Sequence, residues 1–272
     1  MKRILCMPLA TVFLFGLGAA AHADVITVTN VTTGTKTNQW YKANVAGQGT
    51  TAANTATQAR SGNGSVEMSL NGSNGKADYV YTWNFVTGRT LGNLNALSYD
   101  WYRQSGGTSY GFFQPAFRLF YDADGSASTS NDRGYLIFEQ VYNAPSFNGP
   151  VPVDQWNSSD ILGANFWMRQ LSPTNTVENY NTTLATWMGG FQPTTAADKL
   201  SANTAILGIE FGIGSGWNGS FHGFVDNVTI GFGSNSTTWN FETTAAAVPE
   251  PASLALVGLG LLGVAARRRR KD

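Results

Sequence analysis

Three short runs rich in β-branched and aromatic residues occupy residues 205–241, which read AILGIEFGIGSGWNGSFHGFVDNVTIGFGSNSTTWNF. The runs are Ala205–Ile213, Ser220–Phe232 and Thr237–Phe241, and clusters of Gly, Ser and Asn separate them. Runs of this composition bounded by turn residues are typical of β-strands joined by tight connections. The stretch therefore predicts three consecutive strands.

The same pattern recurs along the chain, whereas an apolar stripe with helical spacing and caps is missing. Thr182–Phe191 or Thr194–Leu200 could hold one short helix, and the Gly47–Gly64 and Asn143–Ser159 stretches read as loops. Many short strands with turn signals predict an all-β fold, an antiparallel β-sandwich or jelly roll. The remaining expected strands are Val25–Thr29, Ser65–Leu70, Asp78–Val86, Leu97–Arg103, Ala116–Tyr121, Gly134–Tyr142 and Phe166–Leu171.

The composition of residues 24–248 excludes several functional classes. This region holds ten basic and fifteen acidic residues and has no internal linker, so we expect one acidic domain. It has no Lys/Arg cluster to neutralise phosphates, which argues against nucleic-acid binding. Its lack of cysteine excludes disulfides and thiolate sites, and its single histidine, His222, excludes a three-histidine metal site.

The first 23 residues have the organisation of a secretory signal peptide. Lys2 and Arg3 precede an apolar run, Ile4–Leu17, and Ala21 and Ala23 form an A-x-A cleavage site. We therefore expect export and removal of residues 1–23 by signal peptidase.

The C-terminus combines an uncharged apolar segment with a basic cluster. Ala252–Ala266 is short for a full bilayer span of roughly 20 residues, but flanking arginines can extend it by snorkelling. The positive-inside rule then places residues 24–248 outside, held by a single transmembrane helix. The basic residues that follow the segment are Arg267, Arg268, Arg269, Arg270 and Lys271.

Pro249, Glu250 and Pro251, followed by this apolar segment and the arginines, resemble the PEP-CTERM sorting signal, which some domain collections label an ice-binding protein C-terminal domain. The resemblance divides the chain into a signal peptide (1–23), an ectodomain (24–248) and a sorting signal (249–272). It implies a bacterial protein held transiently in the inner membrane. An exosortase, a membrane protease, would cut near Pro249–Pro251, and the product would reach the cell surface or the extracellular matrix, typically in bacteria that make exopolysaccharide.

Two segments of the ectodomain also resemble bodies that carry PEP-CTERM tails. These are residues 117–143, FRLFYDADGSASTSNDRGYLIFEQVYN, and residues 221–241, which include the GFVDNVTI run. A C-terminal strand with a sequence like GFVDNVTI is common in jelly-roll and concanavalin-like secreted modules. The resemblance implies a concanavalin-like sandwich and contact with glycans.

Asp122, Asp124 and Asp132 form the most distinct candidate metal site. Two carboxylates at i and i+2, followed by Gly125, suit an oxygen-seeking cation such as calcium, and Asp132 is near enough in sequence to return to the same loop. The pattern departs from an EF-hand because no Glu closes the loop at the twelfth position. The alternative is a polar hairpin turn that favours Asp and Gly for conformational reasons.

Most of the eight tryptophans fall in alternating strands, where burial in the core is expected. Trp156 and Trp217 lie instead in Gly-, Asn- and Pro-rich surroundings. Exposed indole rings can stack on the apolar C–H faces of sugars. We therefore predict Trp156 and Trp217 as glycan contacts.

Glu139 and Glu210 are acidic residues within apolar runs and would suit a glycoside hydrolase if their carboxyl groups faced each other at roughly 5–10 Å. The simpler interpretation is that each faces solvent or pairs with an arginine such as Arg118 or Arg133. The sequence thus favours a non-catalytic, exported surface protein with a structural or adhesive task, associated with exopolysaccharide or surface glycan. The alternatives are a polysaccharide-active enzyme and a component of protein–protein surface assemblies.

Overall fold

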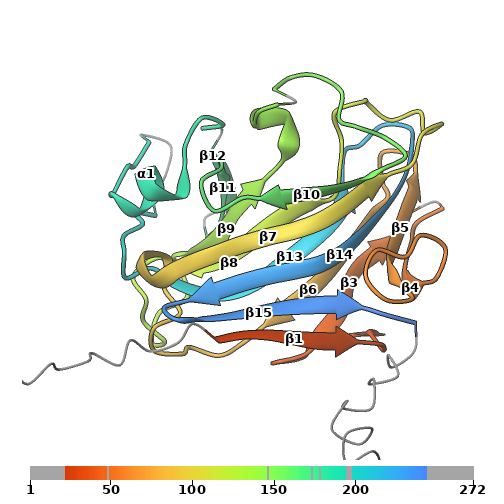
Figure 1. The fold of residues 1–272 in the computed structure, drawn as a ribbon. Coiled ribbons are helices and arrows are strands. Elements are labelled where there is room, and N and C mark those ends of the chain that lie inside the picture. The colour runs from red at the N-terminus through yellow and green to blue at the C-terminus, as the bar shows by residue number, and fades with distance from the viewer. Residues whose placement is uncertain are drawn as a thin grey trace, which may run out of the picture.

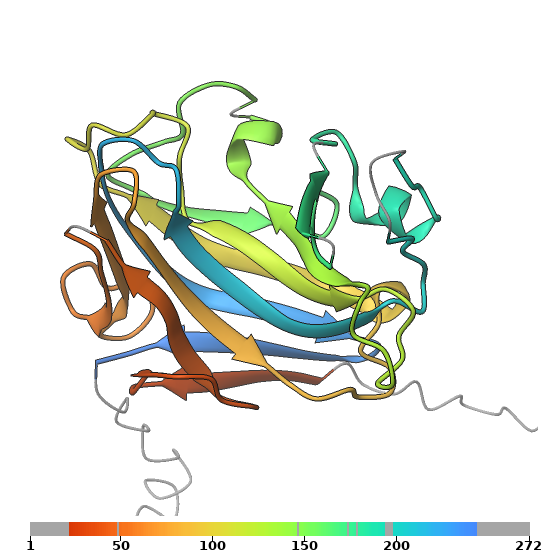
Figure 2. The ribbon, with the colours of Figure 1, turned by 180° about the vertical axis from the view of Figure 1, so that it is seen from behind.

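The computed structural model describes residues 22–47, 49–145, 147–172, 174–177, 179–193 and 198–243. Two curved β-sheets lie face to face in this part of the chain (Figure 1), and the view from behind shows the second sheet in front (Figure 2). The first strand, β1 (His22–Val28), lies beside the last, β15 (Asn235–Phe241), with which it pairs in parallel. The beginning and the end of the described chain are therefore joined within one sheet.

The first sheet is built around the long strand β14 (Ser220–Phe232). One edge of β14 pairs with β7 (Leu94–Arg103) along most of its length, and β7 pairs with β10 (Trp156–Asp160). The other edge pairs first with β5 (Ser65–Asn71) and then with β15. The sheet is completed by β4 (Thr51–Thr55), which pairs with β5, and by β1 at the far side of β15.

The second sheet runs in the order β12-β11-β9-β8-β13-β6-β3-β2, and its neighbours are antiparallel except β2 and β3. Its central strand is β13 (Ala205–Gly214). The only α-helix within the described residues is α1 (Leu184–Met188), and 3-10 turns cover Leu91–Asn93 and Gln140–Tyr142. The other strands are β2 (Thr32–Thr33), β3 (Trp40–Ala46), β6 (Lys76–Thr82), β8 (Ala116–Asp122), β9 (Arg133–Phe138), β11 (Trp167–Leu171) and β12 (Thr174–Val177).

The space between the two sheets is filled by an aromatic and aliphatic core. Alternate residues of β13, Ile209, Phe211 and Ile213, are fully buried there. Rings from opposite sheets meet: Trp40 of β3 lies with its ring centroid 5.1 Å from that of Phe241 of β15. Burying a side chain of this size contributes roughly 1.5–3 kcal/mol, so this layer holds the sheets together.

The intervening residues of β13 point to the outer face of the second sheet. They are Gly208, Glu210, Gly212 and Gly214, so three of the four positions carry no side chain. At Gly212 a Cβ atom would lie 2.1 Å from Oδ1 of Asp78. The central strand therefore leaves the outer face hollow and brings its neighbours' polar groups close to the backbone.

The all-β class predicted from the sequence is confirmed, as is a short helix within Thr182–Phe191, where Thr183 accepts a hydrogen bond from the Thr186 backbone N–H. Two expected loops are corrected. Gly47–Gly64 contains β4, and Asn143–Ser159 runs into β10. Both strands are polar and lie at an edge of the first sheet, where exposed faces do not need an alternating apolar pattern.

Several predictions about the chain ends fall outside the described residues. These include residue Ala21, the Pro249–Pro251 motif, the expected transmembrane helix and the terminal arginines. Ala23 is described and lies in β1, where cleavage after it would leave Asp24–Val28 paired with β15. Among the described residues, none of the helices is both long and apolar enough to cross a bilayer.

Candidate functional site

A groove follows the hollow outer face of the second sheet, above β13. It consists of two adjoining cavities of ≈ 270 and ≈ 140 Å³ that share Asn44, Tyr135 and Glu210 in their walls. The larger cavity extends across β8, β9 and β11 towards Trp217, which follows β13. Neighbouring strands thus bring polar and aromatic side chains together where the glycines of β13 leave space.

The floor of the groove is a buried cluster of charged groups. Arg118 of β8 donates a hydrogen bond from Nη1 to Oδ1 of Asp78 at 2.7 Å and a second one to Glu210. Lys76 Nζ lies 3.0 Å from Oδ2 of Asp78, and Asn44 donates to the same oxygen at 2.7 Å. The registers of β6, β13 and β8 place these residues side by side on one face. Every acid of this floor therefore has a cation as partner.

The two floor acids respond differently to burial. Burial raises the pKa of Glu210 to about 7, because desolvation outweighs the attraction of Arg118. Burial would also raise the pKa of Asp78, but Arg118 and Lys76 together hold it below its usual value. At neutral pH, Asp78 is therefore the ionised partner of Arg118, whereas Glu210 is close to its titration midpoint and is the acid of the cluster that takes up a proton first.

Glu139, immediately after β9, lines the same cavity as Glu210. Its Oε2 accepts a hydrogen bond from the indole N–H of Trp167 at 3.0 Å. Burial raises the pKa of Glu139, against the effect of this hydrogen bond and of Arg118. The structure thus brings into one groove the two glutamates that the sequence singled out separately, and it pairs Glu210, rather than Glu139, with Arg118.

Aromatic rings border the groove. Tyr135 and Trp167 are half-buried and line the larger cavity next to the charged floor. Trp217 closes one end of the cavity; it is 5% exposed and stacks on Phe113 with ring centroids 4.5 Å apart. Of the two tryptophans predicted as glycan contacts, Trp217 therefore belongs to this groove.

Trp156 lies elsewhere, on the outer face of the first sheet. It begins β10, where its ring is 5.8 Å from that of Tyr102 and the guanidinium of Arg60 stands 6.0 Å from the ring centroid. On the same sheet, His222 pairs with Glu67 at 2.7 Å, not with Asp226. The two predicted glycan contacts are thus not brought together, and a glycan contact at Trp156 stays a prediction for a different surface.

A larger cavity, of ≈ 630 Å³, opens beside β1 and β15 and is walled by Trp83, Phe232 and Trp239 among others. Its single charged residue, Arg89, stands over the Trp83 ring at 4.6 Å. Because this cavity gathers no set of titratable groups, its size alone gives no reason to prefer it as a site.

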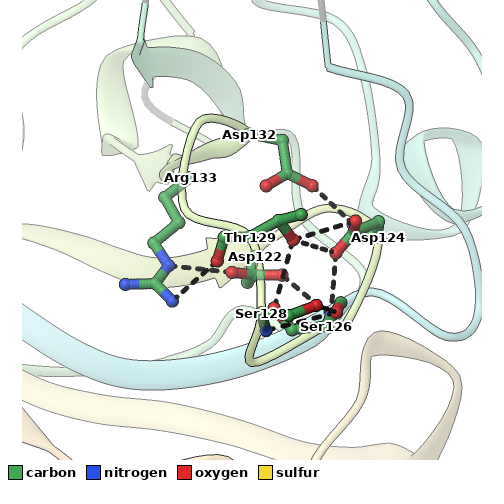
Figure 3. Close-up of polar contacts among 7 residues, drawn as sticks. All are labelled: Asp122, Asp124, Ser126, Ser128, Thr129, Asp132 and Arg133. Atoms are coloured by element: carbon green, nitrogen blue, oxygen red, sulfur yellow. Dashed lines mark hydrogen bonds and ion pairs between the residues drawn. The ribbon is translucent and has the colours of Figure 1, made fainter.

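The turn between β8 and β9 brings the three predicted calcium ligands together (Figure 3). One carboxylate oxygen from each of Asp122, Asp124 and Asp132 lies within 4.8 Å of the others. Asp122 is fully buried and pairs with Arg133 at 2.8 Å. Oδ2 of Asp132 accepts a hydrogen bond from the backbone N–H of Asp124 at 2.8 Å.

Hydrogen bonds within the turn already use much of this acceptor capacity. The Asp124 carboxylate accepts the backbone N–H of Ser126 at 2.8 Å and the hydroxyl of Thr129 at 3.0 Å, and these bonds lower its pKa. Burial raises the pKa of Asp122 in spite of Arg133. Calcium takes 6–8 oxygen ligands, so an ion here would need several carbonyl or water ligands beyond the three acids. Both the calcium site and the polar turn remain compatible with this geometry.

Sequence reasoning did not select Arg118, Asp78, Tyr135, Trp167 or Arg169 as site residues, although all five lie in the groove or its floor. A signal for the hollow was present in the G-I-E-F-G-I-G run of residues 208–214. On a strand, alternate glycines on one face imply either close packing or a depression around the remaining side chain. Which neighbours fill that depression depends on strand order, which the sequence did not supply.

Comparisons with known proteins give one match to a protein family, and no curated protein matches the chain. One similar solved structure is the family 11 carbohydrate-binding module from Clostridium thermocellum, in complex with a β-1,3-1,4-mixed-linked tetrasaccharide. It is 13% identical to this chain, and its TM-score is 0.35. The alignment covers 76% of this chain and 90% of that one. A carbohydrate esterase from Shiga toxin-encoding bacteriophage phi24B is 10% identical, with coverages of 71% and 90% and the same TM-score. At such scores neither likeness carries an argument about this chain. The PEP-CTERM protein-sorting motif matches residues 247–270, which confirms the resemblance drawn from Pro249–Pro251 and the arginines: the chain ends in a PEP-CTERM sorting signal.

Proposed function

We propose that this chain is an exported, exosortase-sorted surface protein whose sandwich binds a glycan, without catalysis, in the groove above β13. The sorting part of the proposal rests on the PEP-CTERM motif at residues 247–270. Signal peptidase would remove residues 1–23, and an exosortase would process the chain near Pro249–Pro251 after transient retention in the inner membrane. The sandwich would then act at the cell surface or in an extracellular matrix of exopolysaccharide.

The observation that carries the glycan proposal is the pairing of ring faces with fixed polar groups in one groove. Tyr135 and Trp167 border a hollow whose floor offers Asn44, Arg118 and Glu210. A sugar ring has apolar C–H faces that pack on aromatic rings and an equatorial belt of hydroxyls that needs donors and acceptors. The groove provides both at neighbouring positions.

The partners of the two glutamates favour binding over catalysis. Hydrolysis of a glycosidic bond needs one carboxylic acid as proton donor and one free carboxylate as nucleophile or base. Arg118 holds Glu210, and the Trp167 indole holds Glu139. These contacts position both groups as hydrogen-bonding partners for sugar hydroxyls.

The test is isothermal titration of the full chain with the exopolysaccharide of the producing organism, in a polyoxyethylene detergent, because a sugar-based detergent would compete. We expect saturable binding that Trp167→Ala weakens about tenfold, which corresponds to ~1.4 kcal/mol. Phe147→Ala is the matched control, because Phe147 is 53% exposed and lies outside the groove. Absence of binding, or equal losses in both variants, would overturn the proposal.

A glycoside hydrolase is the second candidate, because Glu139 and Glu210 share a cavity and both have raised pKa values. The same titration mixtures answer this question if reducing ends are counted over time. Release of reducing ends that stops in both Glu139→Gln and Glu210→Gln would replace binding by hydrolysis as the function of the groove.

A further inference from the structure

The groove gathers basic residues in an otherwise acidic domain. Lys76, Arg118 and Arg169 reach it from three strands, β6, β8 and β11. They are three of the ten basic residues in residues 24–248, a region with five more acids than bases. With Asp78, Glu139 and Glu210 the groove and its floor hold as many basic as acidic residues, whereas the domain as a whole is acidic.

The acids of the groove account for only two of these cations. Asp78 binds both Lys76 and Arg118, and Arg118 also binds Glu210. Asp78 is fully buried and does not line the cavity, so Lys76 and Arg118 are partly neutralised by an acid beneath the groove. Glu139 is held by an indole N–H instead of a cation. Every acid of the groove therefore has a hydrogen-bonding or ionic partner other than Arg169.

Arg169 stands at the wall of the groove beside the aromatic rings. It is exposed, faces Tyr135 in the pairing of β11 with β9, and lies two residues from Trp167 on the same face. Its backbone pairs with β9 and β12, but its side chain forms no hydrogen bond or ion pair with any residue in the described ranges. An exposed guanidinium with no side-chain partner in the described chain, lining the same cavity as Tyr135 and Trp167, is suited to receive a carboxylate on two parallel N–H groups.

We propose that the groove takes a glycan that carries carboxylate groups, a polymer of the uronic acid class, with Arg169 binding the carboxylate and the rings beside it supporting the sugar. This inference rests on the proposed function and names the ligand class of the same groove. The surplus acids elsewhere in the domain do not prevent it, since charges more than about 10 Å away are screened at 0.1 M salt.

The experiment compares polygalacturonate with its fully methyl-esterified form, which keeps the sugar and removes the charge. Titrations use the full chain in polyoxyethylene detergent at 0.15 M salt, with a chelator present so that calcium does not gel the polymer. The variants are Arg169→Gln, Arg169→Lys and Lys199→Gln. The last removes one positive charge at an exposed position outside the groove and is therefore the matched control.

We expect the charged polymer to bind at least about tenfold more tightly than the ester. Arg169→Gln should remove this preference, Arg169→Lys should retain part of it, and Lys199→Gln should leave it unchanged. Equal affinity for the two polymers would overturn the uronic acid assignment, and so would equal effects of Arg169→Gln and Lys199→Gln. If Trp167→Ala still weakened binding in that case, the proposed glycan-binding function would stand. Failure of all glycans to bind would instead overturn the proposed function.

Discussion

Glu210 and Asp226 are two buried acids on central strands of opposite sheets, and they have different roles. Glu210 on β13 is 6% exposed and Asp226 on β14 is fully buried. Burial raises the pKa of Glu210 to about 7 and that of Asp226 to about 6. Judged by pKa alone, both would be candidates for a functional site.

Their partners separate them. Asp226 accepts backbone N–H groups from Phe241 at 2.8 Å and from Ser61 at 3.1 Å, which ties a loop and the last strand to the irregular pairing beside Asn227. Glu210 accepts from the side chain of Arg118 and lines a cavity. A raised pKa therefore reports burial, whereas the identity of the partners shows whether a group holds the backbone together or is presented to a ligand.

The largest effect is expected for Asp226→Ala. It would leave two buried backbone donors without acceptors, and each such donor costs 1–3 kcal/mol. We expect the free energy of unfolding to fall by about 3 kcal/mol at pH 7, measured by urea denaturation with tryptophan fluorescence. Glycan binding should stay at the wild-type level at temperatures where the variant is folded.

The control is Asp24→Ala, since the Asp24 side chain is 59% exposed and its ion pair is with the likewise exposed His22. Loss of binding in a folded Asp226→Ala protein would break the distinction between the two acids. So would an unfolding free energy no lower than that of the control.

An effect of comparable size is expected from the titration of Glu210. The folded chain keeps this proton to about pH 7, whereas the unfolded chain releases it near the usual value of 4.5. The folded state therefore binds more protons between these limits, so the free energy of unfolding falls as pH rises from about 4.5 to about 7. We expect a loss of about 3 kcal/mol over this range from Glu210.

Glu210→Gln should make the decline shallower from pH 4.5 to 7, and the difference between the two acids should show between pH 6 and 7, because Asp226 titrates at about 6. The corresponding variant Asp226→Asn should remove only the part below pH 6. In the same window, binding of an acidic glycan should weaken as Glu210 ionises. Glu210→Gln should reduce this dependence on pH, and what remains should come from Glu139, which lines the same cavity and also has a raised pKa. Identical pH profiles for the two variants would contradict the assignment of different roles.

The fold class could be predicted from the sequence because the central strands are buried on at least one face. β13 and β14 have strong alternation of apolar residues, which the buried layer requires. The edge strands β4 and β10 were missed, and so was β3, whose second half, Asn44–Ala46, is polar or small and irregularly paired with β6. At an edge, pairing depends on neighbours distant in sequence, which a local pattern does not encode.

The groove could be predicted only in part for the same reason. Glu139 and Glu210 attract attention as acids in apolar runs, and both do line the groove. Their distance in sequence gives no sign that they share a cavity, because this depends on β8 and β9 lying beside β13. By contrast, the turn that carries Asp122, Asp124 and Asp132 is local, and there spacing along the chain was enough to predict that the three acids meet.

This turn provides the smallest and last test. Of its three acids, Asp122 is fully buried like Asp226, whereas Asp124 is exposed. If the three carboxylates bind calcium, Asp132 should contribute the oxygen that has no hydrogen-bond partner in the described chain, Oδ1. We expect millimolar calcium to raise the thermal midpoint by a few degrees, corresponding to about 1 kcal/mol, and magnesium to do so less, because it demands six ligands in near-ideal geometry.

Asp124→Asn is the informative variant, because it removes one charge from an exposed position of the turn and keeps an oxygen for the Ser126 and Thr129 hydrogen bonds. Asp124→Asn should abolish the rise in thermal midpoint that calcium causes. It should not lower the thermal midpoint measured in chelator. If calcium and chelator give the same midpoint in the wild-type chain, the turn is held by its own hydrogen bonds and by Arg133, and its acids are structural like Asp226. If calcium raises the midpoint, the turn joins Glu210 among acids that serve a ligand, and titrations of glycan with and without chelator then show whether the two sites act together.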